Sequence, residues 1–283
     1  MLRPICSGLM LFYVATTLSV AQQPDEKIVY KRTTGADGAA VKLALHVFKP
    51  DGHAAGDRRG AIVLFFGGGF NGGKPSQFYP QCLHLASRGM VAIAAEYRVK
   101  SRNGTTPRES FFDGRSALRW VRAHADELGV DPQRIAAGGG SAGGFVAQVT
   151  PIDKQLDEPG EDTTVACRPD ALVLFNPMFD SSQGFFAYSR LKGYWRDVSP
   201  VHNVNKHHPP TIAFLGEKDH IVPVESAERY RDAVRAAGGR CELHIYPEQK
   251  HGFFNRHKNA KAYADTVDKV TKFLDSLGYL SDN

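Results

Sequence analysis

The sequence is poor in cysteine, and the cysteines that are present show no spacing that suits a metal site. Four occur in 283 residues, and Cys6 lies in an N-terminal segment that we expect to be removed. The other three, Cys82, Cys167 and Cys241, are an odd number, so at most one disulfide can form within the chain. We expect buried or bridging cysteines, and the sequence implies no metal ion and no cofactor.

Basic runs and internal repeats are also missing. The net charge is +5, but the 35 lysines and arginines are spread along the chain. This distribution gives no support to a nucleic-acid-binding protein. The apolar fraction of 42% and the mixed charge are typical of a globular protein with a substantial core. The length allows one large α/β domain or two small ones.

One long apolar stretch stands at the N-terminus, in MLRPICSGLMLFYVATTLSVAQQ. A single arginine, an apolar run and a final Ser-Val-Ala are typical of a secretory signal peptide, here over residues 1–21. The alternative is a retained anchor helix, but the run is short for a span of ~20 residues. We therefore expect a secreted or periplasmic protein with no membrane span after cleavage. Residues 22–283 are then expected to form a single domain.

Short apolar runs alternate with amphipathic stretches from residue 27 onward. Continuous runs, typical of buried parallel strands, occur at residues 61–66, 90–97, 171–176 and 211–216. Helical spacing occurs at residues 111–129, 226–239 and 262–279. This alternation predicts an α/β fold, with a mostly parallel sheet and helices on both of its faces. Ligands in such folds bind beyond the carboxyl ends of the strands.

Two segments interrupt this alternation. Residues 151–169 are acidic and irregular, whereas residues 177–209 are rich in aromatic side chains. We interpret the second segment as an excursion of the same domain over the functional site. The alternative is a packed surface loop.

A serine stands within a run of glycines in RIAAGGGSAGGFVAQ, residues 134–148. Gly139, Ser141 and Gly143 match the pattern G-x-S-x-G, with a predicted strand before it and a possible helix after it. This strand–turn–helix setting is that of a nucleophile elbow, whose strained turn makes the serine Oγ project. Side chains at Gly139 and Gly143 would collide with the adjacent strand and helix. The pattern therefore predicts Ser141 as a nucleophile.

Other interpretations of these glycines fit less well. A phosphate-binding P-loop needs a lysine after its last glycine, and none follows here. A dinucleotide-binding motif matches residues 138–143 loosely, but these come late in the chain rather than in the first βαβ unit. A flexible loop is the remaining alternative.

A second glycine cluster, LFFGGGFNGG, follows the predicted strand at residues 61–66. Acyl transfer passes through an oxyanion that needs preorganised N–H donors, each contributing about 3 kcal/mol. Glycines let the backbone approach the reacting group closely enough to supply them. We expect these donors to be Gly68, Gly69 and Ala142, because Ala142 begins a helix, where N–H groups are free. A mobile hairpin turn is the alternative, but the cluster lies between a strand and a helix.

A serine nucleophile needs a general base, and the chain has 11 histidines. His251, in YPEQKHGFFN, follows a predicted strand and precedes the last helix, which places it on the expected rim. His244 lies inside that strand and residues 207–208 adjoin prolines, so we expect structural roles for them. His202 and His220 stay open as alternatives.

The base in turn needs a carboxylate partner. Asp219, in FLGEKDHIVP, follows the predicted strand TIAFLG. It gives the chain order Ser141, Asp219, His251, which is that of the α/β-hydrolases. Glu217 lies too close to the strand end, and Asp180, after the preceding predicted strand, is the reserve candidate.

With these residues in place, the chain resembles the small serine esterases of the α/β-hydrolase superfamily. That group includes acetyl-xylan and feruloyl esterase-like proteins and the relatives of hormone-sensitive lipase. The resemblance covers roughly residues 35–280 and is carried by FFGGGF, AEYR (95–98), GGGSAGG, GEKDHIVP and KHGFF. It implies the α/β-hydrolase fold, with a mostly parallel eight-stranded sheet.

The sequence departs from the family pattern at two positions. Phe66 stands where the family usually has histidine before its glycines, which puts the support of the oxyanion loop in question. Gly140 precedes the serine where lipase relatives often have aspartate. This difference favours carbohydrate-ester hydrolases over the lipase branch.

The resemblance implies a secreted serine carboxylesterase that hydrolyses short-chain, acetyl esters through an acyl-enzyme. Its expected substrates are small-molecule esters or acetylated polysaccharides, and the oligomeric state is left open. One alternative is a serine peptidase of the prolyl-oligopeptidase type, although such enzymes usually carry an N-terminal propeller. A non-catalytic binding protein on the same scaffold is the other alternative, but it would not need all three triad members.

Overall fold

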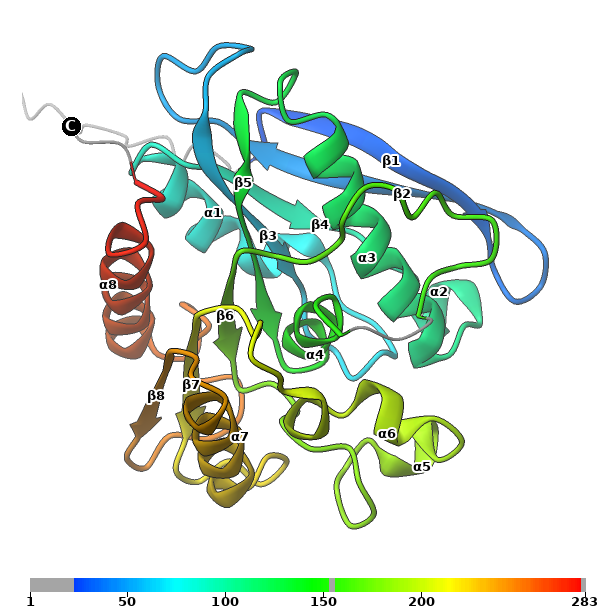
Figure 1. Cartoon of the computed structure of the whole chain (residues 1–283), viewed down its shortest axis with the longest axis vertical. Helices are drawn as coiled ribbons and strands as arrows, with labels where there is room; N and C mark the ends of the chain where they lie inside the picture. Colours follow the sequence, from blue (N-terminus) through cyan, green and yellow to red (C-terminus); the bar gives the residue numbers. More distant parts are fainter. Residues whose placement is uncertain (1–22, 153–155, 281–283) are drawn as a thin grey trace, which may run out of the picture.

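A computed structural model describes residues 23–152 and 156–280 of the chain, so the expected signal peptide lies outside it (Figure 1). Eight strands form one sheet in the order β1-β2-β4-β3-β5-β6-β7-β8. Strands β1 and β2 are antiparallel to their neighbours, and the pairs from β4 to β8 are all parallel. The prediction of a mostly parallel, eight-stranded sheet is confirmed.

The strands are β1 (Glu26–Thr34), β2 (Ala40–Phe48), β3 (Arg59–Phe65), β4 (Val91–Ala95), β5 (Val130–Gly140), β6 (Ala171–Phe175), β7 (Thr211–Gly216) and β8 (Cys241–Tyr246). The α-helices are α1 (Tyr79–Ala86), α2 (Lys100–Asn103), α3 (Pro107–Ala123), α4 (Ala142–Val149), α5 (Tyr188–Leu191), α6 (Trp195–Val198), α7 (Val224–Ala236) and α8 (Ala260–Asp275). Two short 3₁₀ helices are η1 (Pro75–Phe78) and η2 (Pro200–Asn203).

Helices cover both faces of the sheet, as predicted. Along β3, Ala61, Val63 and Phe65 contribute to one buried cluster, while Ile62 and Leu64 contribute to another. The first cluster lies under α3, α4 and α7, and the second lies under α1 and α8 (Figure 1). Because alternate residues of a strand point to opposite faces, a strand buried on both sides is apolar throughout. This explains the continuous apolar runs.

The ends of helix α3 differ from the sequence prediction. The helix begins earlier, because Thr106 and Glu109 form a capping box ahead of the first turn, with Pro107 at its start. It ends at Ala123 rather than continuing to Gly129. The next residue, His124, leaves the helical conformation, and its ring stacks on Trp120 with centroids 3.9 Å apart.

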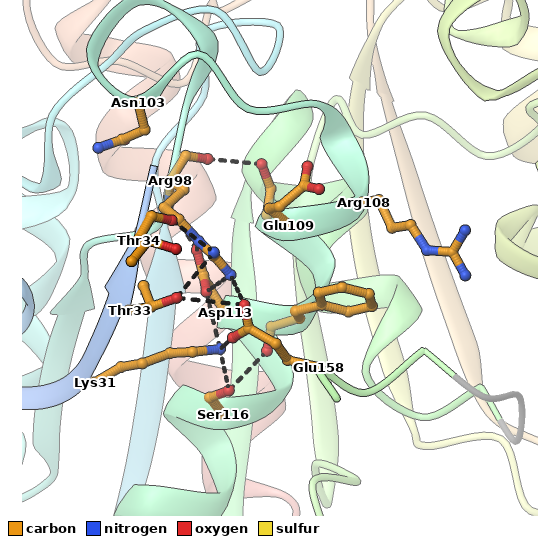
Figure 2. Close-up of polar contacts among 12 residues, drawn as sticks. Lys31, Thr33, Thr34, Arg98, Asn103, Arg108, Glu109, Asp113, Ser116 and Glu158 are labelled. Atoms are coloured by element: carbon orange, nitrogen blue, oxygen red, sulfur yellow. Dashed lines mark hydrogen bonds and ion pairs between the residues drawn. The ribbon is translucent and has the colours of Figure 1, made fainter. Parts of the chain in front are cut away.

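The acidic segment after α4 has no helix or strand in its described part, yet ion pairs attach it to the domain. Figure 2 shows its Glu158 among Lys31, Arg98 and Asp113, which come from β1, the loop after β4 and α3. Arg98 pairs with Asp113 at 2.8 Å and with Glu158 at 2.9 Å, and the Asp113 side chain is fully buried. Burial alone would raise the pKa of Glu158, but the bonds and charges of Lys31 and Arg98 leave that pKa lowered.

The three cysteines outside the N-terminal segment are all free and buried, so they form no bridge. Burial raises the pKa of each thiol, that of Cys241 to about 12. Within the described ranges, we find no helix with the length and apolar character that a bilayer crossing requires.

Candidate active site

Ser141 stands on the turn between β5 and α4, with φ 51° and ψ −119°. This backbone conformation is strained for a non-glycine residue and persists only where its surroundings hold it. The N–H of Ser141 donates to the carbonyl of Phe175 at 2.9 Å, and its own carbonyl accepts from Phe145 N–H at 3.0 Å. The turn is therefore fixed by the neighbouring strand β6 and by the first turn of α4.

The glycines around Ser141 leave room for this turn. A Cβ atom at Gly139 would lie 2.4 Å from the carbonyl oxygen of Phe65 and 2.6 Å from the backbone of Gly143. One at Gly143 would lie 2.1 Å from the same Phe65 oxygen. Atoms this close cannot coexist, so the predicted collisions with strand and helix are confirmed. At Gly140, a Cβ would meet the ring of Phe254 at 2.5 Å.

His251, on the loop after β8, contacts both of its expected partners. Its Nε2 lies 2.9 Å from Ser141 Oγ, and its Nδ1 lies 2.7 Å from Asp219 Oδ2. Because a carboxylate only accepts, Nδ1 carries the proton and Nε2 is left to accept from the serine hydroxyl. The structure therefore brings together the three residues named from the sequence.

Asp219 follows β7 and is held in place by the backbone. Its Oδ1 accepts from the N–H groups of Ile221 at 2.9 Å and Val222 at 3.1 Å, and its side chain is fully buried. The reserve candidate Asp180 is also buried, but it pairs with Arg229 at 2.9 Å. Among the described residues, the Asp180 carboxylate therefore pairs with Arg229 and makes no hydrogen bond to His251.

The other histidines lie in different surroundings. His244 stacks on Phe214 in the sheet, and His208 bonds the hydroxyl of Tyr230 at 2.7 Å. His202 contacts Ser199 at 2.9 Å, and His220 is exposed.

Asn176 is a site residue that the sequence analysis missed. It follows β6 with φ 38°, and its side chain is fully buried. Its Oδ1 accepts from Gly252 N–H at 3.0 Å, which turns its Nδ2 toward His251 Nε2 at 3.2 Å. The only available signal was an asparagine directly after an apolar strand, at the edge where ligands bind in such sheets.

The loop after β3 lies against the serine turn. A Cβ atom at Gly67 would be 3.4 Å from the Cβ of Ser141. In the described part of the chain, the N–H groups of Gly68, Gly69 and Ala142 donate to no protein acceptor, whereas Gly67 N–H donates to Gln77 Oε1 at 2.6 Å. Gly68 and Gly69 have φ values of 134° and 61°, which favour glycine. The three expected donors are thus available to a ligand.

Phe66 supports this loop by packing instead of by a histidine hydrogen bond. It is fully buried and stacks on Tyr97, with ring centroids 4.2 Å apart and an interplanar angle of 16°. The Tyr97 hydroxyl donates to the Phe66 carbonyl at 2.6 Å. The aromatic pair holds the start of the glycine loop against the segment that follows β4.

The arrangement can remove a proton from a serine hydroxyl and stabilise the charge that develops on its base. Free N–H groups beside the serine can bind an oxyanion. Over residues 23–152 and 156–280, no three His, Cys, Asp or Glu side chains gather as a metal site.

Comparisons with known proteins agree with this geometry. A family model described as BD-FAE matches residues 45–172, and one described as the dienelactone hydrolase family matches residues 173–278. A structure of esterase 2 from Thermogutta terrifontis with bound propionate is 42% identical, with a TM-score of 0.85. The alignment covers 93% of this chain and 98% of that one.

The same esterase has also been solved phosphoramylated by tabun; that structure is 43% identical, with a TM-score of 0.85, over 91% of this chain and 96% of that chain. Among curated proteins, "Probable carboxylic ester hydrolase LipM" of Mycobacterium tuberculosis (strain ATCC 25618 / H37Rv) is 32% identical over 225 residues. These residues make up 72% of this chain and 51% of that protein. The chain spans about half the length of LipM and of other curated relatives that it matches.

Proposed function

Because this chain belongs to the esterases of the α/β-hydrolase fold, we propose that it is a carboxylic ester hydrolase with Ser141 as its nucleophile. His251 is the general base, and Asp219 orients its ring. The observation that supports this most strongly is the pair of hydrogen bonds on His251, at 2.9 Å to Ser141 and 2.7 Å to Asp219.

In the first half-reaction, His251 Nε2 takes the hydroxyl proton as Ser141 Oγ attacks the ester carbonyl carbon. The N–H groups of Gly68, Gly69 and Ala142 bind the resulting oxyanion, each contributing about 3 kcal/mol. The intermediate then collapses, and the departing alcohol receives the proton from His251. Water attacks the acyl-enzyme with the same base and releases the acid.

We further propose that the acyl group is short, with acetyl esters as preferred substrates and acetylated polysaccharide as one natural source. Support comes from the propionate bound to the related esterase 2 and from the sequence resemblance to carbohydrate-ester hydrolases. Export through a signal peptide of residues 1–21 would bring the enzyme to such material. Mass measurement of the mature protein tests this export, because cleavage after Ala21 leaves Gln22 as the first residue.

An acyl-length series of p-nitrophenyl esters, together with a Ser141→Ala variant, tests the function. We expect the highest kcat/KM for acetate, and a loss of about 10⁴-fold or more in the variant. Ser87→Ala, at the exposed serine directly after the end of α1, is the matched control and should keep full activity. A variant at Ser141 that kept its activity would contradict the nucleophile.

Two further measurements separate the alternatives. Turnover of proline amides without ester turnover would indicate a peptidase. Absence of any turnover, with no labelling of Ser141 by a fluorophosphonate, would indicate a non-catalytic protein. The tabun adduct of esterase 2 supports the choice of an organophosphorus probe.

A further inference from the structure

A cleft of about 880 Å³ lies beside the glycine loop and is bounded by the segments that follow β3 and β8. Gly67 and Gly68 form one wall, and residues 255–258 form the opposite wall. The cleft adjoins the candidate active site on both sides. Gly67 packs near Ser141, and Lys258 Nζ donates to the His251 carbonyl at 3.4 Å.

The charges that line the cleft are all positive. Lys74, Arg256 and Lys258 line it together with His257, and no aspartate or glutamate does. All three permanent cations are exposed, and none has a carboxylate within 4.0 Å among the described residues. The buried Arg98, in contrast, pairs with Asp113 at 2.8 Å.

The wall of the cleft is braced by a chain of amides. Gln77 accepts from Gly67 N–H at 2.6 Å and donates to Asn255 Oδ1 at 3.0 Å. Asn255 is buried and donates to the Gly252 carbonyl at 2.7 Å. The glycine loop and the His251 loop are therefore linked through Gln77 and Asn255, which fixes the spacing between the cleft and Ser141.

Neighbouring charges reinforce the positive field. Arg102 donates to the Gly73 carbonyl at 2.7 Å, and Arg190 donates to that of Gly69, so two further cations contact the glycine loop. The nearby carboxylate of Asp219 is buried against His251. A cleft lined by charges of one sign concentrates the field on a ligand of the opposite sign.

We propose that this cleft binds an anionic group of the substrate, a carboxylate on either the alcohol or the acyl side of the ester. The inference rests on the proposed ester hydrolysis and narrows its substrate class. Arg256 and Lys258 are the principal contacts, with Lys74 on the facing wall. A neutral ester would leave these cations in solvent, whereas a carboxylate would pair with them as Ser141 reaches the carbonyl carbon.

Matched pairs of esters test this inference on the full-length mature protein. On the alcohol side, 4-acetoxybenzoate is compared with neutral 4-acetoxybenzamide. On the acyl side, the p-nitrophenyl half-ester of adipate is compared with p-nitrophenyl hexanoate. We expect kcat/KM to favour the anion about five- to tenfold in at least one pair, because several exposed ion pairs each contribute modestly. The preference should shrink in 0.5 M salt.

The preference should fall to about one in the double variant Arg256→Gln, Lys258→Gln. Using the ratio within a pair removes any general effect of losing the Lys258 contact with His251. Lys74→Gln removes only the cation on the facing wall, so it should lower the ratio by a smaller factor. Lys206→Gln, an exposed lysine before β7 at the opposite edge of the sheet, should leave it unchanged. An identical ratio in the wild type and the double variant would overturn the inference but leave ester hydrolysis intact.

If no ester is cleaved, the proposed function fails, and direct binding then tests the anion site by itself. Calorimetry on Ser141→Ala protein then compares 4-hydroxybenzoate with 4-hydroxybenzamide for the alcohol side, and monomethyl adipate with methyl hexanoate for the acyl side. Tighter binding of the anion in at least one pair, lost in the double variant, supports the anion site. Equal binding within both pairs refutes it.

Discussion

At the scale of single residues, Asn176 joins the end of β6 to the loop after β8 that carries His251. Its amide bridges the backbone of Gly252 and the ring of His251, so it holds the base from the side opposite Asp219. Its left-handed backbone is tolerated because asparagine is among the few non-glycine residues that adopt it readily. The residue therefore fixes both the ring and the loop that carries it.

Replacing Asn176 with glycine keeps the left-handed backbone accessible and removes only the amide. We expect kcat for p-nitrophenyl acetate to fall about tenfold, because His251 loses a partner that orients its ring. KM should change little, since Asn176 is buried behind the base. Steady-state kinetics beside Asn176→Ala, which adds backbone strain, measures the two effects separately. Unchanged kcat in the glycine variant would refute the positioning role.

At the scale of elements, α3 anchors both the sheet edge and the serine turn. Its Asp113 gathers Arg98, Lys31 and, through them, the acidic segment (Figure 2). One residue further on, Gly114 lets α3 approach α4 closely, because a Cβ there would lie 2.3 Å from Val146. Helix α4, which follows Ser141, is thus packed against α3, and the ion pairs of Asp113 hold α3 in place.

Asp113→Asn should lower the free energy of unfolding by about 3 kcal/mol, because removing one member leaves buried cations uncompensated. Urea unfolding followed by circular dichroism measures the change. Asp268→Asn, which removes an exposed pair with Lys272 on α8, is the control and should cost less than about 0.5 kcal/mol. Equal losses in the two variants would show that the buried network stabilises the fold no more than an exposed ion pair does.

How far the sequence predicted these elements depended on how local each signal was. Apolar runs such as residues 171–176 located the buried strands, and the glycines around Ser141 located the turn, because both depend on neighbours in sequence. β1 was not identified, since its half-buried residues lack a continuous apolar run. Asn176 and the Arg98 network were missed because their partners lie far away in the sequence and are set only by the packing.

At the scale of the whole molecule, the two edges of the sheet have different roles. The carboxyl edge carries Ser141, Asp219 and His251, whereas the amino edge carries His208, just ahead of β7. Burial, followed by the charge of Arg168, lowers the pKa of His208 to about 4. The acid-sensitive group, His208, therefore lies at the amino edge of the sheet, away from the candidate active site.

His208 should make the fold less stable as the pH falls. Between pH 6.5 and about 4 the unfolded chain binds this proton and the folded chain does not, so stability is full above pH 6.5 and declines toward pH 4. The shift corresponds to roughly 3 kcal/mol. Melting temperatures of His208→Gln should vary less over this range than those of wild type, with exposed His207→Gln as control. Parallel curves for the three proteins would contradict the prediction.

The contact between Ser141 and His251 joins residues 110 positions apart, and the base follows the outermost strand of the sheet, β8. The base can reach the serine only when β8 and the loop after it are in place at the edge of the sheet. A partly folded chain in which the loop after β8 has not docked therefore lacks the contact between Ser141 and His251. In a refolding experiment, the rate at which esterase turnover recovers should therefore report the docking of β8 and of the loop that carries His251.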